Sequence, residues 1–179
     1  MNKLAEFVYQ IGVKQGRRRF FWSLAGALFW YGAVAIMIVL APVVDRALGI
    51  NMSIPLAVRL PVGIILVVLG VPVVLWTVIR FLRAKGTPIP FNPPPALVVN
   101  GLYSVVRNPM HLGWTLLLIG LAVLMQSFTL LVIFMPLFIL AHIIYLKFIE
   151  EKELEKKFGQ AYLDYKNRVP MFVPGLGKK

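Results

Sequence analysis

Long uncharged stretches alternate with short basic segments along the 179-residue chain. Residues 20–44 carry no charged side chain and form a run long enough to cross a bilayer with some tilt. Residues 60–79 form a second uncharged run, which as a helix matches about one bilayer thickness. Pro61 suits the first turn of that helix, whereas Pro72 lies inside it and predicts a kink. The first half of the chain is therefore predicted to cross the membrane twice.

A third uncharged block, residues 110–146, is too long for a single crossing. As one helix it would extend about 55 Å, nearly twice the hydrocarbon core of a bilayer. The polar pair Gln126 and Ser127 divides the block, so we predict two helices joined by a tight turn, with a bend at Pro136. The predicted fold class is all-α: a polytopic membrane helix bundle of about four transmembrane helices, the last two forming a hairpin.

Two polar segments flank the predicted hairpin. Residues 80–107 form a long connection, and its proline-rich part, residues 86–95, is incompatible with regular helix. The tail over residues 149–168 has helical periodicity, and Val169-Pro170 ends it. The apolar face of the tail comprises Leu154, Phe158, Ala161, Tyr162 and Tyr165. We predict an amphipathic C-terminal helix that lies on the membrane surface and closes over the connection, which together form a cofactor site.

Composition supports a single membrane domain. Hydrophobic residues make up 59% of the chain, and its mean hydropathy is +0.80, far above that of a soluble domain. We expect one domain over residues 1–179, with N-terminal helices at 1–83 and a cofactor-binding catalytic core at 84–179. The chain has no cysteine and only two histidines, which argues against a metal centre.

The net charge of +12 is concentrated at the borders of the apolar runs. The basic residues form no stripe on a soluble fold, so we expect no nucleic-acid partner. With a cytoplasmic N-terminus and four crossings, all of the 19 lysines and arginines except Arg46 and Arg59 lie on the cytoplasmic side. This asymmetry predicts a multi-pass protein, such as one of a prokaryotic inner membrane, with both termini cytoplasmic. Asp45 and Arg46 are then expected to be features of an external loop only.

The two polar segments carry motif residues at defined spacing. In the connection they are Leu97, Val98, Gly101, Tyr103, Arg107, Pro109 and Gly113, and in the tail Glu150, Glu151, Leu154, Phe158, Gly159, Tyr162, Tyr165, Val169 and Pro170. In this order, on either side of a helix hairpin, they resemble the pattern of the isoprenylcysteine carboxyl methyltransferase and phospholipid methyltransferase superfamily. Two residues depart from that pattern. Asn108 stands where the family usually has histidine, and His111 where it usually has tyrosine.

The resemblance implies S-adenosylmethionine as the cofactor, and the residue types suit it. A carboxylate of Glu150 or Glu151 can pair with the cofactor's ammonium group or accept hydrogen bonds from its ribose. The structural alternative is that acidic residues simply favour a helix start. Tyr103 is expected either to contact the adenine or to anchor the chain at the membrane interface. The predicted cofactor-binding residues are Leu97, Val98, Gly101, Tyr103, Asn108, Pro109, Met110, His111, Glu150 and Glu151.

Asn108 and Pro109 mark the entry to the third predicted helix. Free backbone N–H groups there are suited to a carboxylate, and an ordinary helix start with Asn108 as N-cap is compatible with that role. The predicted catalytic residues are Arg107, His111 and Arg168. The two arginines suit an anionic substrate group or, alternatively, anionic lipid headgroups. For an amine acceptor, His111 or a tyrosine is the first candidate base. For His142, inside the last span, a hydrogen bond between helices is the expected role.

These features together predict an integral membrane methyltransferase that uses S-adenosylmethionine. Its acceptor is expected to be lipid-like or isoprenylated, methylated at a carboxylate oxygen or an amine nitrogen, and a small thiol remains open. A carboxylate acceptor needs no general base, whereas an amine must lose a proton. The expected partners are a lipid or lipid-linked substrate and the bilayer, without metal; the oligomeric state is left open. The alternatives are a protein similar to NADPH-dependent sterol-type reductases and a non-enzymatic membrane scaffold, and cofactor binding separates all three.

Overall fold

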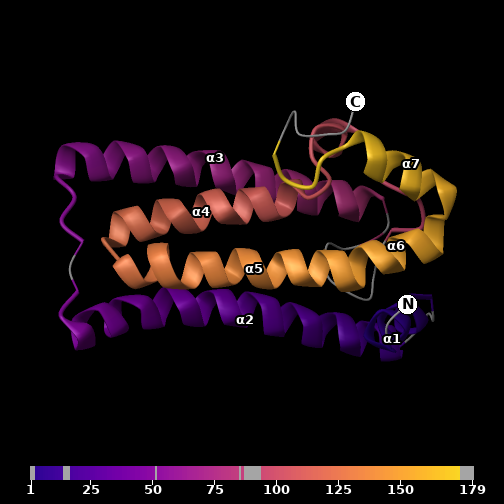
Figure 1. Ribbon diagram of the computed structural model, residues 1–179, viewed down its shortest axis with the longest axis horizontal. Coiled ribbons are helices and arrows are strands. Elements are labelled where there is room, and N and C mark those ends of the chain that lie inside the picture. Colours follow the sequence, from indigo (N-terminus) through magenta and orange to yellow (C-terminus); the bar gives the residue numbers. More distant parts are fainter. Residues whose placement is uncertain (1–2, 14–16, 51, 85, 87–93, 174–179) are drawn as a thin grey trace.

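The computed structural model describes residues 3–13, 17–50, 52–84, 86 and 94–173, and every regular element among them is a helix, which confirms the all-α prediction (Figure 1). The α-helices are α1 (Lys3–Val13), α2 (Arg17–Leu48), α3 (Leu56–Arg83), α4 (Pro109–Met125), α5 (Met135–Tyr145), α6 (Glu151–Phe158) and α7 (Gln160–Arg168). A short 3-10 helix, η1, spans Gly101–Ser104, and two π-helical segments are η2 (Thr129–Phe134) and η3 (Leu146–Glu150).

The long helices lie side by side in the order α3, α4, α5 and α2, and α1 and α7 lie at the same end of the bundle (Figure 1). Three helical stretches are long and apolar enough to cross a bilayer: Phe20–Leu48, Leu56–Arg83 and Thr129–Phe158. The apolar helix α4 is shorter, with 17 residues or about 25 Å of length. The end with α1 and α7 is called the cavity end below, and the end with the α4–η2 turn is called the far end.

The predicted hairpin is confirmed at its turn. Helix α4 ends at Met125, and Gln126 adopts the left-handed conformation, with φ of 54°, that commonly terminates helices. The last span then begins with the π-helical segment η2, and α5 follows with Pro136 in its first turn. Proline has no N–H group to donate to the preceding turn, so the irregularity lies on its N-terminal side.

Helices α3 and α4 pack closely because glycines face each other at two levels. A Cβ atom on Gly70 would lie 2.7 Å from the carbonyl oxygen of Gly113, and one on Gly120 would lie 2.9 Å from the carbonyl oxygen of Gly63. Without side chains at these positions the two backbones approach closely, as small residues allow between membrane helices. Helix α3 continues past Pro72 to Arg83. The two pairs of glycines thus hold α4 closely against α3.

At the far end, the prediction that Asp45 is a feature of an external loop is wrong. Asp45 does not belong to a loop: α2 extends to Leu48, and the side chain of Asp45 is buried. Its carboxylate accepts hydrogen bonds from Ser127 Oγ at 2.5 Å, Thr129 N at 2.8 Å and Thr129 Oγ1 at 2.5 Å. At the start of a helix the first backbone N–H groups have no partner within the helix. One of them and two nearby hydroxyl groups donate hydrogen bonds to the buried carboxylate of Asp45. Asp45 therefore ties α2 to the hairpin.

The tail also differs from the single helix predicted over residues 149–168. The last span continues through η3 and α6 to Phe158, where Gly159 breaks it with φ of 56° and ψ of −131°, and α7 follows as a separate helix. Glycine adopts this positive φ without a Cβ penalty. The break turns α7 back over the connection, where Tyr162, Tyr165 and Val169 pack against Leu97 and Val99. This contact confirms that the tail closes over the connection.

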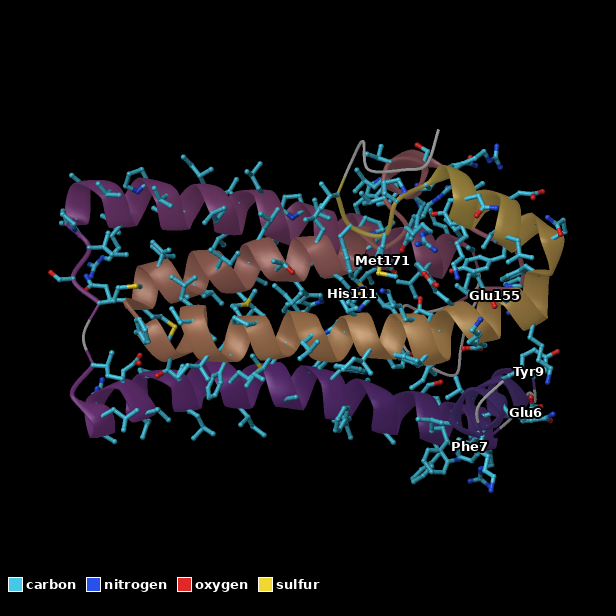
Figure 2. All side chains as sticks on the ribbon, in the orientation of Figure 1. Glu6, Phe7, Tyr9, His111, Glu155 and Met171 are labelled. Carbon is cyan, nitrogen blue, oxygen red and sulfur yellow. The ribbon has the colours of Figure 1, made fainter. Side chains whose placement is uncertain are left out.

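Helix α1 was not predicted from the sequence. Its Val8 and Ile11 are buried, and it packs against α2, η3 and α6. Lys156 of α6 forms an ion pair with Glu6 at 2.6 Å and lies 4.2 Å from the centre of the Tyr9 ring (Figure 2). The start of the chain is thereby held against the last span at the cavity end.

Candidate functional site

A cavity of about 160 Å³ lies at the cavity end, between α2, α4, the last span and the polar connection. Aromatic and apolar side chains form most of its wall, and polar groups converge on it from the two predicted motifs. Its lining residues are Ala27, Trp30, Tyr31, Val34, Phe81, Pro94, Ala96, Leu97, Val98, Tyr103, Arg107, Asn108, Met110, His111, Trp114, Phe138, His142, Tyr145, Leu146, Glu150, Glu151, Glu153, Leu154, Phe158, Tyr162 and Tyr165. An apolar cavity with a few convergent polar groups is typical of a binding site for a small molecule.

The last span lines this cavity over a long distance because of its π-helical segment. Six of its lining residues are spaced four apart: Phe138, His142, Leu146, Glu150, Leu154 and Phe158. In a regular α-helix each step of four residues rotates the side chain by about 40° around the axis, so such a series would leave the cavity. The segment η3, Leu146–Glu150, contains hydrogen bonds of the wider π type, which reduce the rotation per residue. Glu150 is therefore brought back to the face that carries His142.

The structure separates the two acidic residues of the tail motif. Glu151 is buried in an ion-pair network, with its carboxylate 2.7 Å from Arg107 and 2.6 Å from Lys166. Glu150 and Glu153 line the cavity, and within the described part of the chain neither accepts a hydrogen bond nor forms an ion pair within 4 Å. Glu153 is buried and Glu150 is partly exposed, and Lys157 is a nearby positive charge for Glu153. Because carboxylates shielded from water normally accept hydrogen bonds, these two are suited to receive a cationic or hydrogen-bonding ligand.

Arg107 and Arg168 lie in different surroundings. Arg107 lines the cavity, but it donates a hydrogen bond to Glu151, and its backbone N–H donates to the carbonyl oxygen of Pro170 at 2.8 Å. Arg168 is exposed, donates from Nε to the Asp164 carbonyl oxygen at 3.2 Å, and is not among the lining residues. Its role in holding a substrate stays a prediction that this placement does not favour.

The entry to α4 is held by the segment after α7. The backbone N–H of Asn108 donates to the carbonyl oxygen of Met171 at 3.2 Å, and its side-chain amide donates to the same oxygen at 3.4 Å. Asn108 occupies the N-cap position, with Pro109 in the first turn, but its side chain makes no capping hydrogen bond. The first turn of α4 thus lacks a side-chain cap, while Asn108, Met110 and His111 line the cavity.

Tyr103 lies in the wall between the connection and the end of α3. Its ring centre is 6.1 Å from Trp76 and 5.8 Å from Phe81, and its carbonyl oxygen accepts a hydrogen bond of 2.7 Å from the Tyr165 hydroxyl. Burial, together with the nearby Glu150, raises the pKa of the Tyr103 hydroxyl far above its ordinary value. The phenol therefore stays protonated and available as a donor.

Two of the predicted cofactor residues, Gly101 and Pro109, do not line the cavity. Gly101 is not among the lining residues; it has φ of 66°, and a Cβ there would lie 2.5 Å from the Trp76 ring. Pro109 is buried and also absent from the lining. The remaining predicted cofactor residues all line the cavity: Leu97, Val98, Tyr103, Asn108, Met110, His111, Glu150 and Glu151. Their roles toward a cofactor stay predictions.

Both histidines line the end of the cavity away from Glu150 and Glu153. That end is called the inner end below, and the end with the two acids is called the outer end. The ring centres of His111 and His142 are 4.6 Å apart, and Figure 2 shows His111 between α4 and α5. His142 does not form the predicted hydrogen bond between helices: its Nδ1 lies 2.7 Å from the carbonyl oxygen of Phe138, one turn back in its own helix. The ring also packs against Trp30 of α2 at 4.4 Å, with 40° between the two planes, and within the described residues it has no hydrogen bond to another helix.

Several lining residues were missed by sequence reasoning. Glu153 follows Glu150 by three residues, a helical spacing that places both on one face, and this signal was available. Trp30 and Tyr31 of α2 and Trp114 of α4 carry no comparable signal, because aromatic residues in apolar spans are indistinguishable from packing residues. Tyr145 carries no comparable signal either, and His142 was considered only for a hydrogen bond between helices.

Part of the sequence matches a family of known proteins, and the part that matches contains most of the cavity lining. The sequence model of the phospholipid methyltransferase family matches residues 58–161, which is more than half of the chain and includes α4, the last span and α6. The chain belongs to the phospholipid methyltransferase family. The matched part contains most of the cavity lining described above, including Glu150, Glu153 and both histidines.

Two curated relatives carry a more specific name. The chain is 30% identical over 99 residues to a methanethiol S-methyltransferase of Crocosphaera subtropica, covering 55% of this chain and 35% of that protein. It is 37% identical over 75 residues to methanethiol S-methyltransferase 2 of Bradyrhizobium diazoefficiens, covering 42% of this chain and 27% of that protein. The matches thus span about a third of the length of these relatives.

Proposed function

We propose that this protein is an integral membrane methyltransferase that takes its methyl group from S-adenosylmethionine. The observation that carries the proposal is the pair of carboxylates, Glu150 and Glu153, that line a mainly apolar and aromatic cavity and accept no hydrogen bond from the described residues. The cofactor has an ammonium group and a sulfonium centre, which are the charges that such a pair stabilises. Its ribose hydroxyls are further donors to a carboxylate.

Other lining residues fit the cofactor's remaining parts. The uncapped first turn of α4 offers backbone N–H groups to a carboxylate, the protonated hydroxyl of Tyr103 is a donor, and Leu97 and Val98 supply an apolar surface for an adenine ring. When bound, the cofactor supplies a methyl group on a positively charged sulfur that leaves as a neutral sulfide. The chain itself positions the two reactants and excludes water from them.

The acceptor is proposed to be lipid-like or isoprenylated, with its reactive oxygen or nitrogen beside the cofactor. The inner half of the cavity supports this, since Trp30, Tyr31 and Trp114 form an aromatic wall between membrane helices. An acceptor that partitions into the bilayer reaches such a site from the lipid phase, while the polar cofactor reaches the outer end from water.

A small thiol is the second candidate acceptor. The printed names of the two relatives favour it, and so does the inner end of the cavity, where Val34 and Phe138 meet the buried side chains of Leu118 and Met135. Val34 and Phe138 line the cavity and pack into this core cluster, so an apolar surface for a short acceptor is present there. Thiol sulfur also makes favourable contacts with aromatic rings.

Methyl transfer with a labelled cofactor tests the proposal. Purified protein is incubated with methyl-labelled S-adenosylmethionine and, separately, with a total lipid extract or an alkanethiol. Label in an extracted lipid or in a volatile thioether is the expected result. Failure to transfer to either acceptor contradicts the proposal, and reduction of a lipid with NADPH in place of transfer supports a reductase instead.

A matched pair of variants ties any activity to the cavity. Glu153→Gln removes a charge that faces the cavity, whereas Glu155→Gln removes one from the same helix at a position outside the lining. Glu155 pairs with Lys152 and Lys166 at the surface (Figure 2). We expect Glu153→Gln to reduce methyl transfer at least tenfold more than Glu155→Gln. Equal effects of the two changes would remove Glu153 from the site.

A further inference from the structure

The hydrogen bond of His142 determines which of its ring nitrogens carries a proton. Nδ1 lies 2.7 Å from the carbonyl oxygen of Phe138. A carbonyl oxygen only accepts hydrogen bonds, so Nδ1 must be the donor. In the neutral imidazole the other nitrogen, Nε2, then has a free lone pair. His142 is buried, with 7% of its surface exposed, and it lines the inner end of the cavity.

The aromatic surroundings of His142 fix the orientation of its ring. The ring centres of Phe138, Trp30 and His111 lie 4.0, 4.4 and 4.6 Å away, on three different helices. His142 precedes Glu150 by eight residues, or about 12 Å along the axis, and η3 keeps both on the cavity face. The cavity therefore has a carboxylate pair at its outer end and an oriented acceptor of protons at its inner end.

We propose that His142 is the general base that removes the proton from a thiol acceptor bound at the inner end of the cavity. The inference rests on the proposed methyltransferase function and selects the thiol among its acceptors. The S–H proton moves to Nε2 of His142, and the electron pair of the thiol sulfur forms the new bond to the methyl carbon. The methyl carbon's bond to the donor sulfonium breaks, and its electron pair stays on the donor sulfur.

The charges in this step balance. One positive charge is present on the donor sulfonium before the step and on the His142 imidazolium after it, so the net charge of the site is unchanged. The products are a methyl thioether and a neutral sulfide, and the proton then returns to water through the outer end of the cavity. The transfer needs no oxidant, reductant or further reactant.

His111 is less suited to this role, although it was the base expected from the sequence. No hydrogen bond within the described residues fixes the tautomer of its ring, whereas the Phe138 carbonyl fixes that of His142. The rings of His111 and His142 form a T-shaped contact, with 67° between their planes. Its place beside the base suits it to orient His142 or the acceptor.

Nitrogen NMR of labelled histidine tests the tautomer without any turnover. The chain has only two histidines, so a His111→Gln variant leaves His142 as the single labelled residue. At neutral pH we expect a protonated Nδ1 and an unprotonated Nε2. A proton on Nε2, with or without one on Nδ1, would overturn the assignment of His142 as a base. His111 is in ring contact with His142, and the other titratable groups that line the cavity are Tyr31, Tyr103, Arg107, Tyr145, Glu150, Glu151, Glu153, Tyr162 and Tyr165.

A thiol series tests the proton transfer itself. His142→Asn keeps a donor near the Phe138 carbonyl and removes the base, and Ala141→Asn places the same side chain at an exposed position one residue earlier. With ethanethiol, which is protonated at neutral pH, we expect His142→Asn to slow methyl transfer about a hundredfold to ten-thousandfold. With 4-nitrothiophenol, which is already a thiolate, the loss should be less than tenfold, because no proton has to be removed.

The outcomes separate this inference from the proposed function. Equal losses with both thiols, or no loss with ethanethiol, would overturn the role of His142 as a base. Methyl transfer by the wild type to lipid but to neither thiol would overturn the thiol acceptor and leave the proposed methyltransferase standing. Unchanged affinity of His142→Asn for S-adenosylhomocysteine serves as the control for an intact fold.

Discussion

The two ends of the bundle bury an acid to the same extent but use it differently. Asp45 at the far end and Glu153 at the cavity end each expose 5% of their surface. Asp45 accepts three hydrogen bonds from Ser127 and Thr129. Glu153 lines a cavity and accepts none from the described residues. Burial of an acid alone therefore does not mark a candidate site in this protein, and the lack of internal hydrogen bonds to Glu153 is what distinguishes it from Asp45.

The adjacent residues Glu150 and Glu151 show the same difference within a single motif: one acid forms ion pairs inside the protein, and the other faces the cavity. Glu151 is adjacent to Glu150 in the sequence, but about 100° of helical rotation turns it toward Arg107 and Lys166. Glu150 remains on the cavity face. One acid of the motif thus holds the connection and α7 onto the last span, and its neighbour is available to a ligand. Mutation of either is expected to reduce activity, for different physical reasons.

The comparison depends first on which end of the bundle faces the cytoplasm. The distribution of basic residues predicts that the cavity end lies there, together with both termini. The natural chain has no cysteine, so single cysteines at positions 100 and 53 report the two ends without background. In intact cells we expect an impermeant reagent to label position 53 and not position 100. The reverse pattern would place the cavity outside and contradict the proposed cofactor access from the cytoplasm.

Arg107 is expected to give the largest loss of stability among the residues of the cavity end. Arg107→Met removes one partner of the buried Glu151 and leaves Lys166 as the other. Removing one member of a buried ion pair costs about 3 kcal/mol of unfolding free energy. Denaturant unfolding in detergent measures this change. The double variant Arg107→Met, Glu151→Leu is expected to recover most of it, and failure to recover would show that Arg107 contributes in another way.

Asp45 is expected to give a slightly smaller loss, without any effect on ligand binding. Asp45→Ala leaves the hydroxyls of Ser127 and Thr129 and one backbone N–H without their acceptor. The expected destabilisation is about 2 kcal/mol. Affinity for S-adenosylhomocysteine should stay within about twofold of the wild type, since Asp45 is at the opposite end from the cavity. A loss of affinity in a folded Asp45→Ala protein would contradict the separation of the two ends.

The sequence predicted the general fold because hydrophobic runs and helix breakers are local signals. Uncharged runs located the long spans, and Gln126-Ser127 located the hairpin turn. The hairpin in turn places the connection and the tail at one end, so two motifs that are far apart in sequence were expected to meet. The described contacts between Tyr162, Tyr165 and Leu97 confirm that expectation.

The remaining features depend on partners that local patterns do not reveal. The partners of Asp45 are 82 and 84 residues away, so no local pattern indicated that its side chain is buried in the bundle. The helix break at Gly159 was missed because apolar periodicity continues across it. The alignment of His142 with Glu150 requires the π-helical segment η3, which has no established sequence signature.

Calorimetric titration with S-adenosylhomocysteine tests the central claim most directly, because it measures the cavity without requiring the acceptor. We predict saturable binding to the wild type and to Glu155→Gln, with similar affinities. Glu150→Gln keeps the size of the side chain and removes its charge, so the loss of a charge-assisted hydrogen bond should weaken binding about tenfold to a hundredfold. Absence of binding to the wild type, or equal affinities of Glu150→Gln and Glu155→Gln, would contradict the assignment of this cavity as the cofactor site.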